Sequence, residues 1–273
     1  MVRPTSFAFN PETAVTNGFS APGNPERAGE EFIALVAALG RNGIDVQVWE
    51  GPSDAPDAVF PNNWISSHED GRVIVYPMES ESRRRERQNF EGSCIDLTGW
   101  EAEGKFLEGT GSLVLDRANK TAYASLSPRT HPDAVRDWCA GMGYWPIVFE
   151  ALDRAGAPIY HTNVVLSVGS DWAVFCTRAC PSPNPVLAEL KIAGKEVIEI
   201  DFDQLEAFCG NVIELDGVIV VSKRAWAAFS DEQRAILSMG RAPVVVDIGT
   251  IESIGGGSVR CMIAEWFSPF AHR

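Results

Sequence analysis

Short apolar runs alternate with amphipathic segments along the whole chain. Seven runs rich in β-branched and aliphatic residues predict strands at 45–49, 73–77, 112–116, 163–169, 172–176, 217–222 and 243–248. Four segments with apolar residues at helical spacing predict helices at 24–43, 131–143, 183–195 and 230–240. The two kinds of segment are mixed throughout, and no low-complexity linker separates them. The pattern therefore predicts an α/β fold.

Polar clusters stand beside these runs at a nearly constant interval. Between the cluster residues Asn63, Glu108, His161, Asn211 and Cys261, the intervals are 45, 53, 50 and 50 residues. A period near 50 residues favours a repeat architecture, and five units with inward-pointing loops would gather the five clusters around one pocket. The units share no detectable sequence identity, so chance spacing is the alternative.

Charge and cysteine usage narrow the class of protein. The 273 residues carry a net charge of −14, which argues against nucleic acid or an anionic membrane as partner. The N-terminus lacks the apolar core of a signal peptide, and no run approaches the ~18 apolar residues of a membrane span. Six scattered cysteines favour reduced thiols in a cytoplasmic protein, and no second pair or nearby histidine supports a zinc site at Cys176 and Cys180.

Three glycines stand shortly before Cys261, in the segment "SIGGGSVRCMIAE" at 253–265. A glycine run is typical of a tight turn or of a close approach to the backbone. The thiol could be a packing residue, a metal ligand or a nucleophile. As a nucleophile it would need an activating base, which can lie far away in the sequence.

Of the four histidines, His161 is the best candidate for that base. We expect His68, His131 and His272 to be surface residues, whereas His161 lies at the edge of an apolar strand, where an unpaired imidazole is costly to bury. Glu108 stands similarly alone among apolar residues, before a Gly-x-Gly turn. The alternatives are a structural histidine and a carboxylate bound by backbone amides. A phosphate loop is disfavoured because the strand–helix context and the Gly-Lys-Ser/Thr are missing.

Long motifs from Arg3 to Glu265 resemble the citrulline-utilisation hydrolase group of the arginine deiminase and amidinotransferase superfamily, the penteins. The motifs are "RPTSFAFNPETAVTN", "PDAVFPNNWISSHEDGRVIVYPM", "SRRRER", "KFLEGTGSLVLDR", "AYASLSPRTH", "IYHTNVV", "FCGNVIEL" and "IESIGGGSVRCMIAE". This resemblance implies one domain over 1–273, folded as a five-bladed ββαβ propeller with a central active site. It would also explain the 50-residue period.

The resemblance also implies roles for individual residues. Cys261 matches the nucleophile, His161 the general acid/base, and Glu108 the carboxylate that binds the terminal nitrogens of the substrate. Relatives that act on guanidinium carry an Asp-x5-Asp pattern, which here reads Asp57 and Asn63. Arg83 and Arg129 match residues that bind the α-carboxylate of the substrate, and solvated surface arginines are the alternative. Asn17, Asn163 and Asn211 match residues that contact the substrate or lie behind the catalytic residues.

An amide at Asn63 can donate and accept, and so suits a neutral ureido group. The resemblance therefore implies hydrolysis of the small amino acid citrulline to ornithine, ammonia and carbon dioxide. An arginine dihydrolase, an arginine deiminase-like enzyme and an inert binding propeller, such as the ribosome anti-association factor, are the alternatives. No metal or organic cofactor is implied. A homo-oligomer is possible, and the segment 78–90 is a candidate lid.

Overall fold

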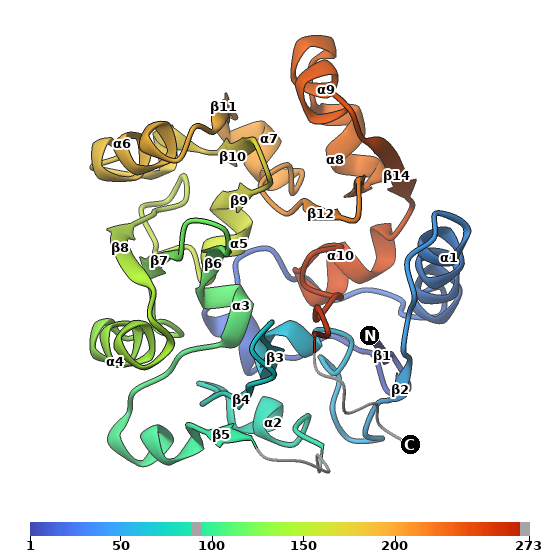
Figure 1. Cartoon of the computed structure of the whole chain (residues 1–273). Helices are drawn as coiled ribbons and strands as arrows, with labels where there is room; N and C mark the ends of the chain where they lie inside the picture. The colour runs from blue at the N-terminus through green and yellow to red at the C-terminus, as the bar shows by residue number, and fades with distance from the viewer. Residues whose placement is uncertain (89–93, 268–273) are drawn as a thin grey trace.

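The computed structural model describes residues 1–88 and 94–267. In this part of the chain the strands form five small sheets, which surround a common centre (Figure 1). In four of the sheets the first strand along the chain pairs antiparallel with the second, and the second pairs parallel with the third. Their strands are β3 (Ile65–Ser67), β4 (Val73–Val75) and β5 (Ile95–Asp96); β6 (Val114–Asp116), β7 (Thr121–Leu126) and β8 (Trp145–Glu150); β9 (Leu166–Val168), β10 (Trp172–Phe175) and β11 (Glu196–Glu199); and β12 (Ile213–Leu215), β13 (Val218–Ser222) and β14 (Ala242–Val246).

The fifth sheet holds β1 (Val2–Arg3) and β2 (Trp49–Glu50), which are parallel. In each of the five units a helical segment connects two parallel strands, as such crossovers require. The α-helices are α1 (Ala28–Arg41), α2 (Glu81–Arg84), α3 (Gly109–Ser112), α4 (Pro132–Met142), α5 (Thr162–Val165), α6 (Asn184–Ile192), α7 (Phe202–Glu206), α8 (Lys223–Ala228), α9 (Asp231–Leu237) and α10 (Gly249–Gly255), and the 3₁₀ helices are η1 (Thr13–Val15), η2 (Pro61–Asn63), η3 (Thr98–Glu103) and η4 (Thr177–Ala179). The predicted α/β fold is confirmed.

Local sequence explains where the longer helices begin and end. The side chain of His131 accepts a hydrogen bond from the backbone N–H of Asp133 and caps α4, which ends at Gly143 in a left-handed conformation. Ser230 and Gln233 form a capping box at the start of α9. Helix α1 buries an apolar face against β14 and α10. All four helices predicted from the hydrophobic pattern are present, and each is shorter than predicted.

Several strand predictions need correction. Within 45–49 only Trp49 is in a strand, because residues 45–48 have no partner in a sheet. Residues 163–165 form α5 and not the start of a strand, and Ser112 belongs to α3. The apolar pattern also missed β8, which lies at a sheet edge and leaves Trp145 exposed. None of the helices in the described residues has both the length and the apolar character needed to cross a membrane.

The innermost strands of the four larger sheets are β3, β6, β9 and β12, as Figure 1 shows. A short helix or turn precedes each of them at the centre of the molecule, and three of these are η2, α3 and α5. Apolar clusters fill the space between neighbouring sheets; the largest runs from Val114 through Phe175 to Leu237. This packing holds the central turns in place.

Candidate active site

The five polar clusters predicted from the 50-residue period meet at these central turns. Asn63 ends η2, Glu108 directly precedes α3, and His161 directly precedes α5. Asn211 lies just before β12, and Cys261 follows α10. Each residue is less than one-twentieth exposed. The spacing in the sequence therefore reflects one turn from each of the five units.

The glycine run before Cys261 makes a tight turn against neighbouring loops. Gly256 ends α10 with a φ of 65°, a left-handed conformation that favours glycine. A β-carbon on Gly255 would lie 2.7 Å from the ring of Phe60, so the ring packs directly on the backbone. Beyond the turn, the N–H of Cys261 donates to the carbonyl of Ser258 over 2.9 Å. The turn thus aims the cysteine at the centre of the molecule.

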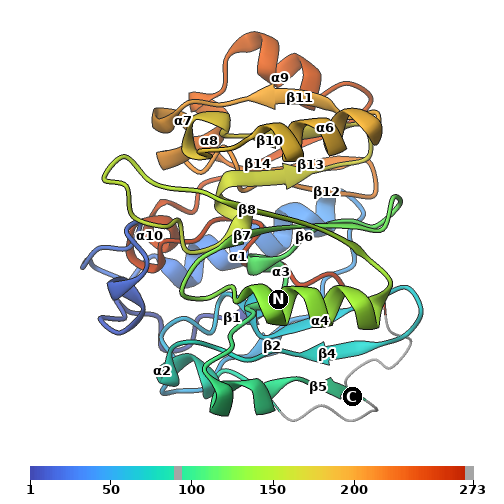
Figure 2. The same cartoon turned by 90° about the vertical axis from the view of Figure 1, so that its left-hand side faces the viewer.

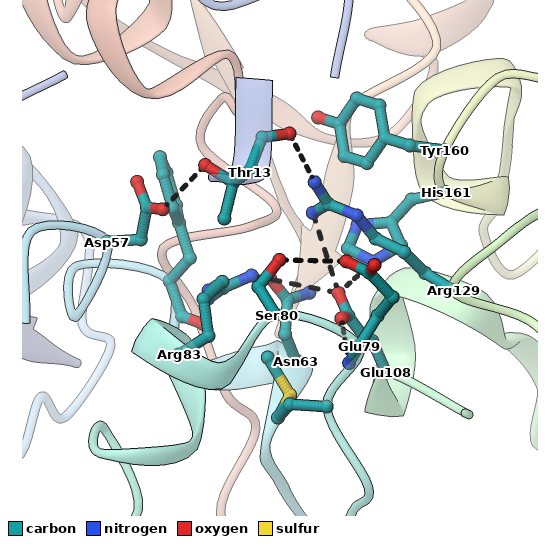
Figure 3. Close-up of polar contacts among 12 residues, drawn as sticks. Thr13, Asp57, Asn63, Glu79, Ser80, Arg83, Glu108, Arg129, Tyr160 and His161 are labelled. Carbon is teal, nitrogen blue, oxygen red and sulfur yellow. Dashed lines mark hydrogen bonds and ion pairs between the residues drawn. The ribbon is translucent and has the colours of Figure 1, made fainter. Parts of the chain in front are cut away.

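Glu108 and His161 form a buried hydrogen-bonded pair, with 2.7 Å between Oε2 and Nε2 (Figure 3). Burial raises the pKa of Glu108, but Arg129, His161 and Arg83 outweigh it and lower the pKa to about 2. Burial lowers the pKa of His161 to about 4, although Glu108 opposes this shift. An ionised carboxylate only accepts hydrogen bonds, so Nε2 carries the hydrogen and Nδ1 is the basic nitrogen.

Both predicted arginines are buried beside this pair, which rules out solvated surface arginines. Guanidinium nitrogens of Arg83 and Arg129 lie 3.7 Å and 3.6 Å from Oε2 of Glu108. Arg83 donates to both carboxylate oxygens of Glu86, over 2.7 Å and 2.8 Å. Burial raises the pKa of Glu86 to about 7 in spite of this contact. Arg129 donates to the carbonyl oxygen of Thr13 over 2.8 Å.

Two asparagine side chains contact the sulfur of Cys261. Nδ2 of Asn211 lies 3.3 Å from Sγ, and Nδ2 of Asn163 lies 3.6 Å from it. Asn211 also donates to the carbonyl of Asn163 over 2.7 Å and accepts from the N–H of Arg260 over 3.0 Å. Burial raises the pKa of the thiol, and these hydrogen bonds only partly offset the effect. The free thiol is therefore protonated near neutral pH.

The other predicted site residues line the same pocket but have partners within the protein. Asp57 accepts hydrogen bonds from Asn10 and Thr13, over 2.9 Å and 3.0 Å. Asn63 accepts from Arg83 over 2.8 Å and donates one hydrogen to Asn62 over 2.9 Å. Asn17 donates to the carbonyls of the glycine turn at 255 and 256. Asn17 thus holds that turn in place.

Sequence reasoning missed three residues of the site. Glu86 pairs with Arg83, and its signal was a lone acid within the arginine run at 83–87. The ring of Tyr160 packs at a tilt against that of His161, with 4.7 Å between ring centroids, and its hydroxyl donates to the carbonyl of Gly256. Thr13 covers the pocket from η1. Nothing in the sequence around Thr13 predicts this contact, because η1 is far along the chain from the other residues of the pocket.

The remaining histidines give a mixed result. His68 is buried, contrary to the predicted surface position: Nε2 lies 2.9 Å from the hydroxyl of Ser66, and burial lowers its pKa to about 4. His131 is half-buried, and His272 lies outside the described residues. In the described chain no three His, Cys, Asp or Glu side chains gather as a metal site would require.

Comparison with known proteins places the chain in a family. A family model described as "N,N dimethylarginine dimethylhydrolase, eukaryotic" matches residues 3–268. The chain belongs to this family. No curated protein matches the sequence. The dimethylarginine dimethylhydrolase family lies within the pentein superfamily, and the chain is a hydrolase that acts on non-peptide C–N bonds.

Solved structures of this superfamily share the fold. The N-terminal domain of ArgZ, an arginine dihydrolase from cyanobacteria, is 15% identical with a TM-score of 0.77, and the match covers 96% of this chain and 95% of that domain. A complex of AgrE with L-arginine is 18% identical with a TM-score of 0.74, and the match covers 96% of this chain and 39% of the AgrE chain. A dimethylarginine dimethylaminohydrolase adduct is 19% identical with a TM-score of 0.68, and the match covers 94% of this chain and 96% of that enzyme. The chain thus spans one domain of ArgZ, and only 41% of the complete ArgZ protein.

Proposed function

We propose that the enzyme hydrolyses citrulline to ornithine, ammonia and carbon dioxide, and so belongs to the citrulline-utilisation group. The observation that carries this proposal is the amide of Asn63, which stands where relatives acting on guanidinium have a second aspartate. Its Oδ1 accepts from Arg83, and one hydrogen of Nδ2 is used by Asn62. The second hydrogen of Nδ2 can donate to the ureido oxygen of citrulline, an interaction that a carboxylate cannot make.

In the first half of the reaction, the sulfur of Cys261 attacks the ureido carbon and its proton passes to Nδ1 of His161. This transfer is needed because the free thiol is protonated and the imidazole is neutral. His161 then gives the proton to the terminal nitrogen, which leaves as ammonia. Glu108 binds the ureido nitrogens and holds the imidazole in place. The product of this half is a covalent adduct in which Cys261 carries the carbonyl group and the rest of the amino acid.

In the second half, water replaces ammonia beside the adduct. His161 takes a proton from the water, which attacks the carbonyl carbon. The C–S bond breaks, and Cys261 recovers its proton. The released carbamate decomposes to ornithine and carbon dioxide. Arg83 and Arg129 are the proposed partners of the α-carboxylate, for which a charge-assisted hydrogen bond to arginine is well suited.

Arginine dihydrolase activity is the second candidate, and one observation favours it. Glu108 stays ionised in the buried site, since its pKa is lowered to about 2, and an ionised carboxylate pairs well with a cationic guanidinium group. An arginine dihydrolase would pass through a citrulline-like intermediate, so Asn63 would serve its second step. The structural similarity to ArgZ supports the fold of both candidates equally.

Product analysis separates the two. Purified protein is incubated with citrulline or with arginine, and ornithine, citrulline and ammonia are followed, with Cys261→Ala as control. We expect ornithine from citrulline with a kcat/KM far above that for arginine. Ornithine from arginine with a comparable kcat/KM would identify a dihydrolase, and citrulline accumulating from arginine would identify a deiminase. We also propose a cytoplasmic location, which the six free cysteines support.

A further inference from the structure

The active-site pocket is narrow, and its catalytic residues are buried. The pocket between Thr13, Arg129 and Cys261 has a volume of about 10 Å³, room for about one water molecule. Cys261 is 2% exposed and His161 is 1% exposed. In the proposed reaction the amino-acid part of the substrate stays bound to Cys261 between the two halves. Substrate binding must widen this pocket, and ammonia must leave and water must enter while the amino-acid part occupies the widened space.

A second, larger cavity lies on the opposite side of the catalytic turns, with a volume of about 370 Å³. Residues at the far ends of the inner strands β6, β9 and β12 line it, among them Arg117, Ser170 and Glu214. Glu108, His161 and Asn211 lie in the turns that precede these strands. In Figure 2, α10 lies at the left of the molecule, and β6 and β12 lie towards the right. The active site and the second cavity thus occupy opposite ends of one set of strands.

The lining of the second cavity reaches the nucleophile through Asn163. Asn163 lines the cavity, and its Nδ2 lies 3.6 Å from Sγ of Cys261. Arg260, the neighbour of Cys261, lines the cavity as well and is held by Glu265 over 3.2 Å. A small movement of the Asn163 side chain would therefore connect the two spaces.

The lining includes buried polar groups beside apolar side chains such as Val114 and Leu166. Ser167 faces the cavity from β9 and is 5% exposed, and its hydroxyl has no hydrogen-bond partner among the described residues. A buried hydroxyl without a partner is unusual in proteins and marks a place where a small polar molecule is stabilised. The buried pair of Lys195 and Asp116, 3.1 Å apart, also lines the cavity. These polar groups suit water and ammonia.

We propose that this cavity is a rear passage through which ammonia leaves and water enters while the adduct is in place, with Asn163 as its gate. The proposal rests on the covalent mechanism proposed above. A route that releases ammonia must also admit it. Ammonia from solution would then attack the adduct carbon, and the C–S bond would break. The sulfur of Cys261 would take up a proton from the ammonia, and the substrate would be re-formed with the new nitrogen.

This reversal provides the test. During turnover of citrulline, or of arginine if that is the substrate, [¹⁵N]ammonium is added, and two rates are measured: ¹⁵N incorporation into unreacted substrate and formation of ornithine. Ser167→Met narrows the cavity at β9, and Ser167→Ala removes the hydroxyl but leaves the cavity open. We expect both rates to fall several-fold in Ser167→Met with an unchanged KM, and both to be kept in Ser167→Ala. Should Ser167→Met fail to fold, Ser167→Val replaces it.

Three results would overturn the passage. The first is a folded Ser167→Met variant that keeps both wild-type rates. The second is a Ser167→Met variant in which ornithine formation falls but ¹⁵N incorporation does not. The third is a wild-type enzyme that incorporates no ¹⁵N during turnover. Failure of the proposed function is seen separately, because the wild-type enzyme would then turn over neither substrate before any label is added.

Discussion

Replacing Asn63 with aspartate should shift the enzyme from citrulline towards arginine. The new carboxylate loses the Nδ2 hydrogen that is free to donate to the ureido oxygen of citrulline. In exchange it gains a charge that can pair with a guanidinium group. Nη1 of Arg83 lies 2.8 Å from Oδ1 of Asn63, so the added charge is compensated within the folded protein. We therefore expect Asn63→Asp to fold and to keep its catalytic residues in place.

The size of the shift follows from the strength of the hydrogen bonds. One that involves a charged group contributes about 1.5–3 kcal/mol, against about 0.5–1.5 kcal/mol between neutral groups. The difference between the two substrates at residue 63 is therefore about 1.4 kcal/mol, or about tenfold in relative kcat/KM. Loss of the bond to the ureido oxygen acts in the same direction.

The assay measures kcat/KM for both amino acids in the wild-type enzyme, in Asn63→Asp and in Asn184→Asp. The last variant adds the same charge at an exposed position at the start of α6, where the helix dipole tolerates it, and controls for net charge. We expect the ratio of arginine to citrulline to rise about tenfold in Asn63→Asp only. A ratio that is unchanged, or that moves towards citrulline, would refute the role of residue 63 in selecting the substrate.

Four further predictions concern the buried groups. Burial holds the pKa of His161 and of His68 at about 4, against 6.5 for a free histidine. Between these pH values the unfolded chain binds more protons than the folded protein. Each histidine should therefore lower the free energy of unfolding by about 1.4 kcal/mol per pH unit as the pH falls through this window, as urea titrations would show. The acid limb of kcat/KM should correspondingly lie near pH 4 and not near 6.5, because His161 must be neutral to accept the thiol proton. Glu108→Gln leaves two buried guanidinium groups without their shared carboxylate and should destabilise the protein by about 3 kcal/mol in urea unfolding, whereas an unchanged midpoint would show that the arginines find other partners. Asn211→Ala should lower kcat, as steady-state assays would show, because the sulfur loses the nearer of its two amide donors, and unchanged kinetics would contradict that role.

The sequence was most informative where a local pattern repeats. The alternation of strands and helices predicted the α/β fold, and the regular spacing of Asn63, Glu108, His161, Asn211 and Cys261 predicted that they would meet. The spacing works because each residue occupies the same place in its unit, at the turn before an inner strand or after α10. A pattern of this kind survives even though the five units share no detectable sequence identity.

The sequence was least informative where contacts join distant units. His68 follows a strand in a polar segment, yet Ser66, Tyr76 and Trp138 enclose it. The density of the arginine run made a surface position plausible for Arg83, but α2 turns this one side chain into the site. In both cases the polarity of the neighbours predicted exposure, whereas burial came from segments far away in the chain.

The most direct test of the central claim is to trap the adduct on Cys261. The enzyme is mixed with citrulline, quenched in acid during the first turnover, and analysed by intact-protein and peptide mass spectrometry. We predict a mass increase equal to citrulline minus ammonia, located on the peptide that contains Cys261 and missing in Cys261→Ala. Ornithine formation without an adduct, or an adduct on another residue, would contradict the proposed mechanism.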